Sequence, residues 1–439
     1  MDPNPREEPG RRRPRLFFGW YIVLASVASN AILSAAYFQG FSALFLPIER
    51  SFGWSRSTIS VALSLRQLET GIASPLIGML LDRITPRRMV FWSAILTGIG
   101  LVGLGLINGV VTFYMAFIVV SLGASGVSHA VTWPVLIARW FRRKRGIAMG
   151  LAVLGPIFGA PFLIVTTSLE EAYGWRAVLI GSGIVAGVTV SLLSLLARDR
   201  PQSYGLLPDG DEPEPEADGS PGRSPAAPEE GLRLREVLHT REFWLLTAYM
   251  GGLFMVNSAI HAHQIPYFVN DRGLTPAEAA VTLMLVFLVS GVGRIGGGYL
   301  MDKSDYRAVL AVMAVLMGAS LVYLQLAEPS TVLGAIPFVV LFGVSFGGMI
   351  PIRGTLGSMM FGLRSLGAVI GLMQGGSVAA GVFGPIFMGI MFDVQGTYHT
   401  AVWGLVGMSF IMAPLPLVMS APDYLRRRRT EAEAVREQA

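Results

Sequence analysis

The sequence contains no cysteine, and charged residues make up only 14% of its 439 positions. Without cysteine there is no disulfide, thiolate metal site or cysteine nucleophile. Soluble domains carry about 25% charged residues, so the low charge excludes a disordered protein, a coiled coil and an ordinary cytosolic enzyme. The chain is instead 52% hydrophobic, with 52 glycines and 26 prolines. These frequencies are typical of membrane helices, which use small residues at contacts and proline at kinks.

A membrane-spanning helix needs about 20 mostly apolar residues, and the sequence contains twelve such stretches in two groups of six. The stretches lie at 17–46, 57–81, 89–107, 110–138, 146–168, 175–197, 242–268, 277–300, 307–327, 331–352, 365–392 and 399–420. The first stretch is too long for a signal-peptide core and lacks a cleavage site after a short apolar run, so we expect it to be retained.

The stretches divide the chain into five regions. These are an N-terminal tail at 1–16, a six-helix half at 17–197, a linker at 198–241, a second six-helix half at 242–420 and a basic tail at 421–439. The linker is rich in Pro, Glu, Asp, Gly and Ser from Pro208 to Glu230, and such a segment cannot bury a core. Leu232 to His239 is either a short amphipathic helix at the membrane surface or the solvated end of the linker.

The positive charges are distributed unevenly over this topology. Of 34 Lys and Arg residues, 27 lie in the tails, the linker and the loops on the same side. Only four lie on the other side, namely Arg50, Arg56, Arg176 and Arg272, and three lie inside spans, namely Arg66, Arg294 and Arg353. Cytoplasmic loops carry the excess of Lys and Arg, so we expect both termini and the linker in the cytoplasm. The net charge of +5 therefore reflects topology and not nucleic-acid binding.

The two halves repeat each other at an offset of about 220 residues. The repeated positions are Gly78 with Gly298, Asp82 with Asp302, Gly53 with Gly273, Phe141 with Phe361, Gly146 with Gly367 and Gly150 with Gly371. Each half contains six spans, so the two halves begin on the same side of the membrane. Parallel repeats of this kind place a substrate site between the halves, near the membrane midplane.

These residues resemble the major facilitator superfamily over nearly the whole chain. The segment from Gly78 to Arg88 (GMLLDRITPRR) is similar to its G-x-x-x-D-R-x-G-x-R loop, with Thr85 in place of the second Gly. The chain is most similar to the monocarboxylate and oxalate–formate branch. The pieces that carry this resemblance are Phe18-Gly-Trp20-Tyr21, Phe52-Gly-Trp-Ser-Arg56, Arg139-Trp-Phe-x-x-x-Arg145-Gly146 and Tyr173-Gly-Trp-Arg176. The resemblance implies an all-α membrane protein with twelve transmembrane helices in two pseudo-symmetric halves.

The resemblance also implies a secondary active transporter of small organic anions, monocarboxylates first, that works by alternating access. Two positions depart from the branch. Its D-x-x-x-R pattern in the eighth span is here Ser290-x-x-x-Arg294, and the lysine near the outer end of its first span corresponds to Gln39. Both changes leave open whether a proton is coupled, and an anion exchanger or a uniporter is an alternative.

Arg294 is the predicted substrate anchor. It lies roughly 12 Å of helix from Asp302, and a charge this deep needs a watery cavity or a partner. Its planar fork suits a carboxylate; a structural ion pair is the alternative. The other predicted substrate-binding residues are Arg66, Asn257, His261, Gln264, Tyr37, Gln39 and His129. For the histidines, an interhelical hydrogen bond is the alternative to a direct role.

Glu69 is the candidate for proton coupling, because it is the one acidic residue expected deep in a span. It lies three residues from Arg66 on one helix face, so a self-satisfied pair that steadies the bundle is the favoured alternative. Arg353 lies near the predicted cytoplasmic end of the tenth span. We expect it to reach lipid headgroups, with gating or substrate binding as alternatives.

Conformational gating is predicted for the repeated loop residues. They are Gly78, Asp82, Arg83, Arg87, Gly298, Asp302 and Lys303. Each carboxylate would cap a neighbouring helix and hold one conformation closed; ordinary flanking charge is the alternative.

No enzyme, cofactor or metal site is predicted. The sequence has no G-x-x-x-x-G-K-[ST] loop, no H-E-x-x-H and no credible triad, and its G-x-G-x-x-G matches lie inside apolar stretches. Gly155-Pro156-x-x-Gly159 loosely resembles the kink motif of drug–proton antiporters. A drug or metabolite exporter and a non-transporting membrane sensor are therefore the alternatives. We expect a monomer in contact with lipids, with an organic anion and a proton as partners, and the resemblance suggests a bacterial inner membrane.

Overall fold

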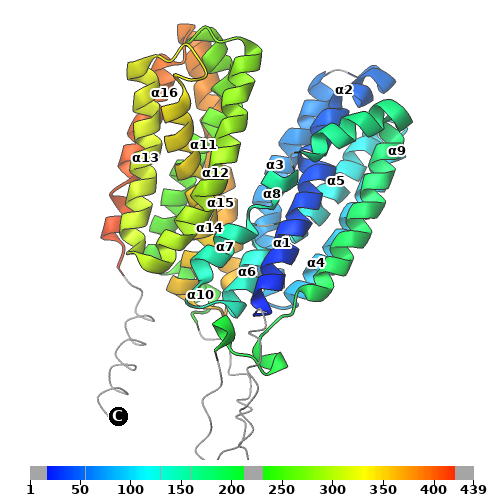
Figure 1. The fold of residues 1–439 in the computed structure, drawn as a ribbon, viewed down its shortest axis with the longest axis vertical. Coiled ribbons are helices and arrows are strands. Elements are labelled where there is room, and N and C mark those ends of the chain that lie inside the picture. Colours follow the sequence, from blue (N-terminus) through cyan, green and yellow to red (C-terminus); the bar gives the residue numbers. More distant parts are fainter. Residues whose placement is uncertain (1–16, 55, 129, 160, 212–230, 421–439) are drawn as a thin grey trace, which may run out of the picture.

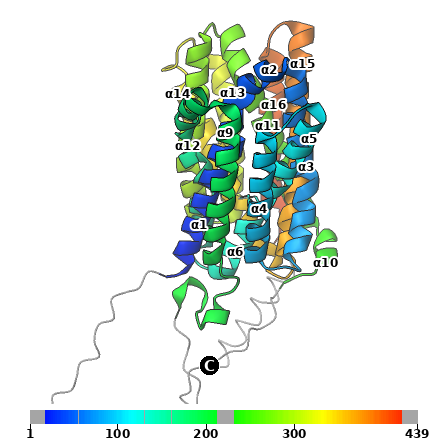
Figure 2. The ribbon, with the colours of Figure 1, turned by 90° about the vertical axis from the view of Figure 1, so that its right-hand side faces the viewer.

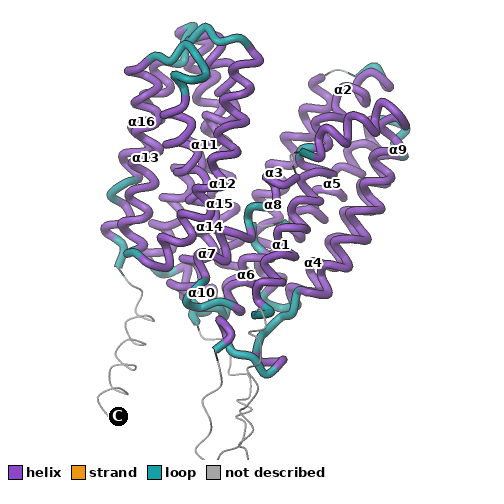
Figure 3. The backbone as a smooth tube through the Cα atoms, in the orientation of Figure 1, coloured by secondary structure: helices purple, strands orange, loops and turns teal. Residues whose placement is uncertain are grey.

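The structure, a computed structural model, describes residues 17–54, 56–128, 130–159, 161–211 and 231–420. Helices dominate these ranges, and most of the loops that join them lie at the two ends of the molecule (Figure 3). The described ranges contain no β-strand, only an isolated antiparallel bridge between Gly231 and Gly362. The all-α prediction is therefore confirmed.

The first half contains a series of straight and broken helices. They are α1 (Gly19–Leu33), the π-helical turn η1 (Ser34–Phe38), α2 (Gly40–Phe52), α3 (Arg56–Leu81), α4 (Pro86–Gly105), α5 (Val110–Val127), α6 (Thr132–Trp140), α7 (Arg145–Ala152), α8 (Gly155–Gly159) and α9 (Phe162–Leu193). The predicted first span comprises α1, η1 and α2, and the fourth comprises α5 and α6. Gly174 divides α9 with a φ of 77°, which glycine adopts without strain. The predicted fifth span therefore runs through α7, α8 and the first part of α9.

The second half contains longer unbroken helices. They are α10 (Leu234–Leu238), α11 (Arg241–Asn270), α12 (Pro276–Lys303), α13 (Tyr306–Ala327), α14 (Ile336–Phe361), α15 (Leu366–Gln395) and α16 (His399–Met412). Thr275 starts α12 with a capping box to Glu278, and Asp305 caps α13. The linker end at 232–239 contains the five-residue helix α10, and Val237 in it is fully buried within the core of the second half.

Ten stretches of described helix are long and apolar enough to cross a membrane. The other two predicted spans correspond to α3 and to the broken segment that begins with the shorter apolar helices at 145–159. Large apolar side chains such as Ile72, Trp92 and Val292 are about two-thirds exposed. Exposed apolar surface of this extent is expected where lipid covers the helices.

The helices form two bundles that meet at one end and diverge at the other (Figure 1). The helices α1 to α9 form one bundle and α11 to α16 the other, each around its own apolar core. A view turned by 90° shows the helices running roughly parallel to the long axis (Figure 2). Leu366 and Ile370 of α15 join the core of the first half, so the two cores touch where the bundles meet.

Candidate functional site

A cavity of about 480 Å³ lies between the two halves. Both halves contribute to it, and its walls are mainly Met, Phe, Leu, Val and Pro. The lining residues are Ser34, Phe38, Gln39, Ala130, Pro134, Met149, Val153, Pro156, Met250, Leu253, Phe254, Asn257, His261, Phe287, Arg294, Phe346, Met349, Ile350, Pro351, Arg353, Gly354 and Gln374. This volume and this mixture of apolar walls with few polar groups are typical of a small-molecule site.

Arg294 projects from α12 into this cavity and is 96% buried. Its neighbour Gly293 packs on α14, where an added Cβ would lie 2.3 Å from the Val344 carbonyl oxygen. Arg294 donates one hydrogen bond to the Val153 carbonyl, across the interface between the halves. Its Nε has no partner among the described residues. Ser290, one turn earlier, donates to the Phe287 carbonyl, so no neighbouring acid offsets the charge on this helix.

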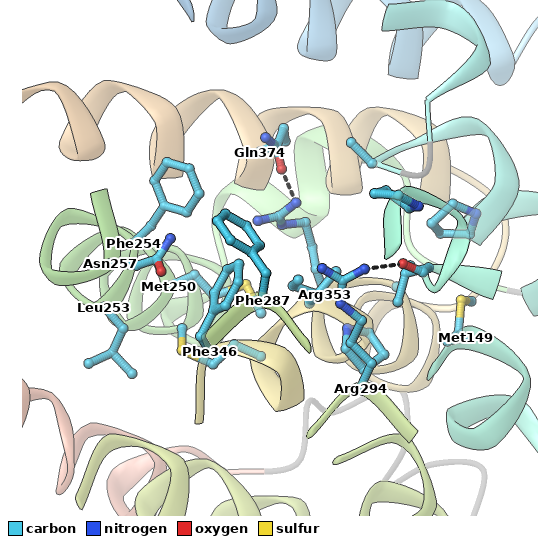
Figure 4. A pocket seen from close by; sticks show the side chains of 18 of the residues that line it. Met149, Met250, Leu253, Phe254, Asn257, Phe287, Arg294, Phe346, Arg353 and Gln374 are labelled. Atoms are coloured by element: carbon cyan, nitrogen blue, oxygen red, sulfur yellow. Dashed lines mark hydrogen bonds between the residues drawn. The ribbon is translucent and has the colours of Figure 1, made fainter. Parts of the chain in front are cut away.

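Arg353 also lines the cavity, and our expectation that it reaches lipid headgroups is wrong. Because α14 continues to Phe361, Arg353 lies two turns inside the helix instead of at its end. Its guanidinium donates to the amide oxygen of Gln374 on α15, and its Nε has no partner in the described chain. Figure 4 shows Arg353 and Arg294 in the same part of the pocket, directed to different partners.

The charge of the cavity is unbalanced. Its lining, as the structure describes it, includes two arginines and no Asp or Glu. Both guanidinium groups donate to neutral acceptors, a carbonyl and an amide. A buried charge without an opposite charge is unfavourable unless a ligand, water or a shifted protonation state compensates it. The cavity therefore suits an anion.

The opposite wall of the cavity comes from α11. His261 Nδ1 lies 2.9 Å from the Asn257 carbonyl oxygen, and its ring packs among phenylalanines with centroid distances of 4.8 to 5.8 Å. Gln39, just after η1, donates to the Pro156 carbonyl at 3.1 Å. Asn257, His261 and Gln39 thus join Arg294 as predicted residues that the structure brings to one cavity.

Of the other four predicted substrate-binding residues, the three that the structure describes do not line this cavity. Gln264 donates to Thr282 at 3.0 Å inside the second half. Tyr37 is fully buried against Phe38 and Phe117. Arg66 lies over the rings of Tyr37 and Phe38, at 5.7 and 5.4 Å. His129, the last of the four, lies outside the described residues.

The favoured pairing of Arg66 with Glu69 is wrong. Glu69 instead accepts hydrogen bonds from Ser121 at 2.5 Å and Ser125 at 3.1 Å, both on α5. The structure shows no ion pair between Arg66 and Glu69, although both are described. The reason is packing: α5 presents two hydroxyls to the carboxylate, while the guanidinium turns to the two aromatic rings of η1.

Two carboxylates connect the halves where the bundles meet. Asp302 of α12 accepts from the backbone N–H groups of Gly146 and Ile147, at 2.6 and 2.9 Å, at the start of α7. Asp82, just after α3, accepts from Gly367 and Ala368 at the start of α15, at 3.1 and 3.2 Å. Each acid of one half therefore caps a helix of the other half, where the helix dipole favours a negative charge.

Glycines make these caps possible by letting the backbones touch. A Cβ added to Gly298 would lie 2.2 Å from the Gly146 carbonyl oxygen, and one added to Gly78 would lie 2.1 Å from that of Gly367. Arg145 adds a hydrogen bond across the interface, to the Ser358 hydroxyl at 3.0 Å. The predicted gating residues Arg83 and Lys303 are exposed, and Arg87 donates its backbone N–H to Asp199 at 3.3 Å.

The Major Facilitator Superfamily model matches residues 27–364 and 265–438 of this sequence. The chain belongs to the Major Facilitator Superfamily. Monocarboxylate transporter 13 from Bos taurus is 25% identical over 414 residues, an alignment that covers 93% of this chain and 90% of that protein. The oxalate:formate antiporter from Oxalobacter formigenes is 23% identical over 375 residues, covering 83% of each chain. The resemblance noted in the sequence is thereby confirmed.

Solved structures of the superfamily share this fold. The fucose:proton symporter of E. coli superposes with a TM-score of 0.67 over 91% of this chain and 98% of that one, at 16% sequence identity. The superfamily fold comprises twelve membrane-spanning helices in two six-helix halves, which confirms the predicted fold class.

Two residues of this cavity, Arg353 and Gln374, are not predicted as cavity residues by the sequence. The sequence pattern places Arg353 too near the end of its span and gives no reason to select Gln374. The available signal was an arginine that follows Pro351 inside an apolar stretch, with a further eight residues before Gly362. An arginine so far from the end of its helix is expected to face a cavity and not lipid.

Proposed function

We propose that this protein is a secondary transporter that moves small organic anions, monocarboxylates first, across the cell membrane by alternating access. The observation that carries the proposal is the pair of arginines, Arg294 and Arg353, in a cavity between the halves whose described lining has no acid. A carboxylate would receive two parallel hydrogen bonds from a guanidinium and offset its charge. The names of the homologous transporters point to the same ligand class.

The apolar walls of the cavity favour an organic acid over an inorganic ion. Met149, Met250, Leu253 and Phe254 line it beside the arginines. Apolar walls offer a sulfate or chloride ion no hydrogen bonds, whereas they remove the carbon body of an organic acid from water.

In this proposal both termini and the linker are cytoplasmic, as the excess of Lys and Arg on that side predicts. The end held by Asp82 and Asp302 is then the cytoplasmic end. Release of substrate to the cytoplasm requires those two caps to break and the opposite ends of the bundles to close.

We assign proton coupling to Glu69. Its carboxylate is half-buried between α3 and α5, bound by two serine hydroxyls and by no described cation. A carboxyl group without a fixed positive partner is able to gain and lose a proton during the transport cycle.

Uptake into proteoliposomes tests the proposal. Radiolabelled lactate or propionate should accumulate inside vesicles that contain the purified protein, and should accumulate faster with an inward proton gradient. Vesicles with the Arg294→Gln variant are the control and should stay at the background of empty liposomes. A sensor would bind these acids without accumulating them. An exporter of drugs would move organic cations but not the acids. Either result rejects the proposal.

A further inference from the structure

Four buried polar atoms, all on residues that line the cavity, have no hydrogen-bond partner in the described chain. They are Arg294 Nε, Arg353 Nε, Asn257 Oδ1 and His261 Nε2. The first two are donors from α12 and α14, and the other two lie one turn apart on α11. Other polar groups of the lining are bonded: Ser34 and Gln39 both donate to the Pro156 carbonyl. Because buried polar groups are normally paired, these four atoms describe what the ligand must offer.

The tautomer of His261 follows from its one hydrogen bond. Its Nδ1 lies 2.9 Å from the Asn257 carbonyl oxygen, which only accepts, so the proton must be on Nδ1. A neutral imidazole then presents Nε2 as an acceptor. The ring is packed against Phe287, Phe342 and Phe346, and the same cavity already holds two guanidinium groups. The acceptor at Nε2 therefore has no donor among the described residues, although His261 lines the cavity.

Asn257 adds a second acceptor on the same helix face. Residues four apart on a helix are neighbours, and the Asn257 side-chain oxygen is buried without a partner. Figure 4 shows Asn257 and Phe254 on one side of the pocket and Arg294 and Met149 on the other, with Arg353 between them. The pocket is thus polarised, with free donors near the arginines and free acceptors on α11.

We propose that the transported anion carries a hydrogen-bond donor, a hydroxyl group, at the end opposite its carboxylate, and that His261 accepts this hydrogen bond. The proposal rests on the organic-anion function above and narrows it to hydroxylated acids with an aromatic body. His261 is then the residue that determines specificity, with Asn257 beside it.

The spacing along α12 sets the length of such a substrate. Phe287, which packs edge-on against the His261 ring, precedes Arg294 by seven residues, or about 10 Å of helix. The arginine side chain leans back toward the start of its helix, which shortens the gap. One aromatic ring with a two-carbon arm bridges this gap, and Phe254, Phe287 and Phe346 provide aromatic walls for the ring.

Three acids of matched shape test the proposal on the unmodified protein. They are 3-(4-hydroxyphenyl)propanoate, 3-phenylpropanoate and 3-(4-methoxyphenyl)propanoate, measured by calorimetry with the full-length protein in detergent. We expect the hydroxy acid to bind about three- to tenfold more tightly than the phenyl acid, as one net hydrogen bond predicts. The methoxy acid offers only an acceptor and should bind no better than the phenyl acid. A methoxy acid that binds as tightly as the hydroxy acid would overturn the proposal.

Two variants test whether His261 causes the preference for the hydroxy acid over the phenyl acid. His261→Phe keeps a ring among the phenylalanines but removes the acceptor, so the affinity ratio of hydroxy to phenyl acid should fall to about one. His263→Phe is the matched control, because His263 lies on the same helix, bonds to Tyr398 and Pro385, and does not line the cavity. Its ratio should match that of the unmodified protein. A ratio that survives in His261→Phe rejects the role of His261.

The same titrations separate this inference from the function on which it rests. If the three acids bind with equal affinity and Arg294→Gln abolishes their binding, the hydroxyl specificity is rejected and the organic-anion function stands. If none of the three acids binds, and short monocarboxylates do not bind either, both proposals are rejected.

Discussion

At the scale of single residues, the chemistry of this protein is concentrated in Arg294. The guanidinium is 96% buried and bonds to one backbone carbonyl of the other half. Arg294→Lys keeps the charge but loses the planar fork, so anion affinity should fall by about 1–3 kcal/mol, roughly 5- to 150-fold. Arg294→Gln should lose anion binding and still fold, because it removes a buried charge that no acid pairs with. Calorimetry checks the expected anion affinity, and thermal unfolding checks that the variant still folds.

Loss of thermal stability in Arg294→Gln together with normal binding would show instead that the arginine has a structural role. Arg307→Gln is a suitable control, because Arg307 is an arginine of the same half that lies outside the cavity lining. Arg307→Gln should change neither the anion affinity nor the thermal stability.

Gln374 offers a test of the second arginine. Because Arg353 already donates to the Gln374 amide oxygen, Gln374→Glu should form an ion pair there and halve the positive charge of the cavity. Anion affinity should then fall about tenfold or more, since the new carboxylate competes with the substrate. Gln374→Met removes the amide without adding charge and should retain most of the affinity. Equal losses in the two variants would show that the amide, and not the charge balance, matters.

Glu69→Gln tests the coupling assignment. If this carboxyl carries the proton, the variant should lose pH-driven accumulation while it still exchanges internal for external substrate. Its hydrogen bonds from Ser121 and Ser125 are available to an amide oxygen, so expression should be normal. Accumulation by a well-expressed Glu69→Gln protein that responds normally to a proton gradient would rule out the role.

At the scale of helices, the end where the bundles meet is held by caps that each half provides for the other. Asp302→Ala removes the cap of α7 and should weaken the closed end by about 1 kcal/mol. Asp305→Ala is the matched control: it removes a cap of α13 within one half. Because the chain has no cysteine, Ser358→Cys provides a single reporter at the interface with Arg145.

The labelling rate of Ser358→Cys by a maleimide should rise several-fold in the Asp302→Ala background and stay unchanged with Asp305→Ala. A similar rise in both backgrounds would mean that lost helix stability, and not opening between the halves, exposes the site.

At the scale of the whole molecule, the direction of the chain in the membrane determines which end is cytoplasmic. The 27-to-4 distribution of Lys and Arg predicts that the linker is inside. In intact cells an impermeant maleimide should label Ser330→Cys, in the exposed loop between α13 and α14. It should not label Pro213→Cys until the cells are opened. The reverse pattern would invert the topology and the assignment of the closed end.

The arrangement of spans could be predicted from the sequence by itself, and so could the caps. These features depend only on the order of residues along the chain. They are the twelve apolar stretches, the repeat at about 220 residues and the paired Asp82 and Asp302. The breaks within spans were less visible. Helices α7, α8 and the first part of α9 share one predicted span because a change of backbone direction leaves apolar composition unchanged.

Only the tertiary structure decided which partner each buried polar group meets. Glu69 binds the serines of α5 and not the nearby Arg66, and Arg353 turns to Gln374 inside a cavity. The aromatic ring set around His261 comes from α12 and α14, far from it in sequence. Local sequence determines which residues share a helix face, but packing sets the rotation of one helix against another. That rotation determines whether a charged side chain meets lipid, a hydroxyl group or a cavity between the halves.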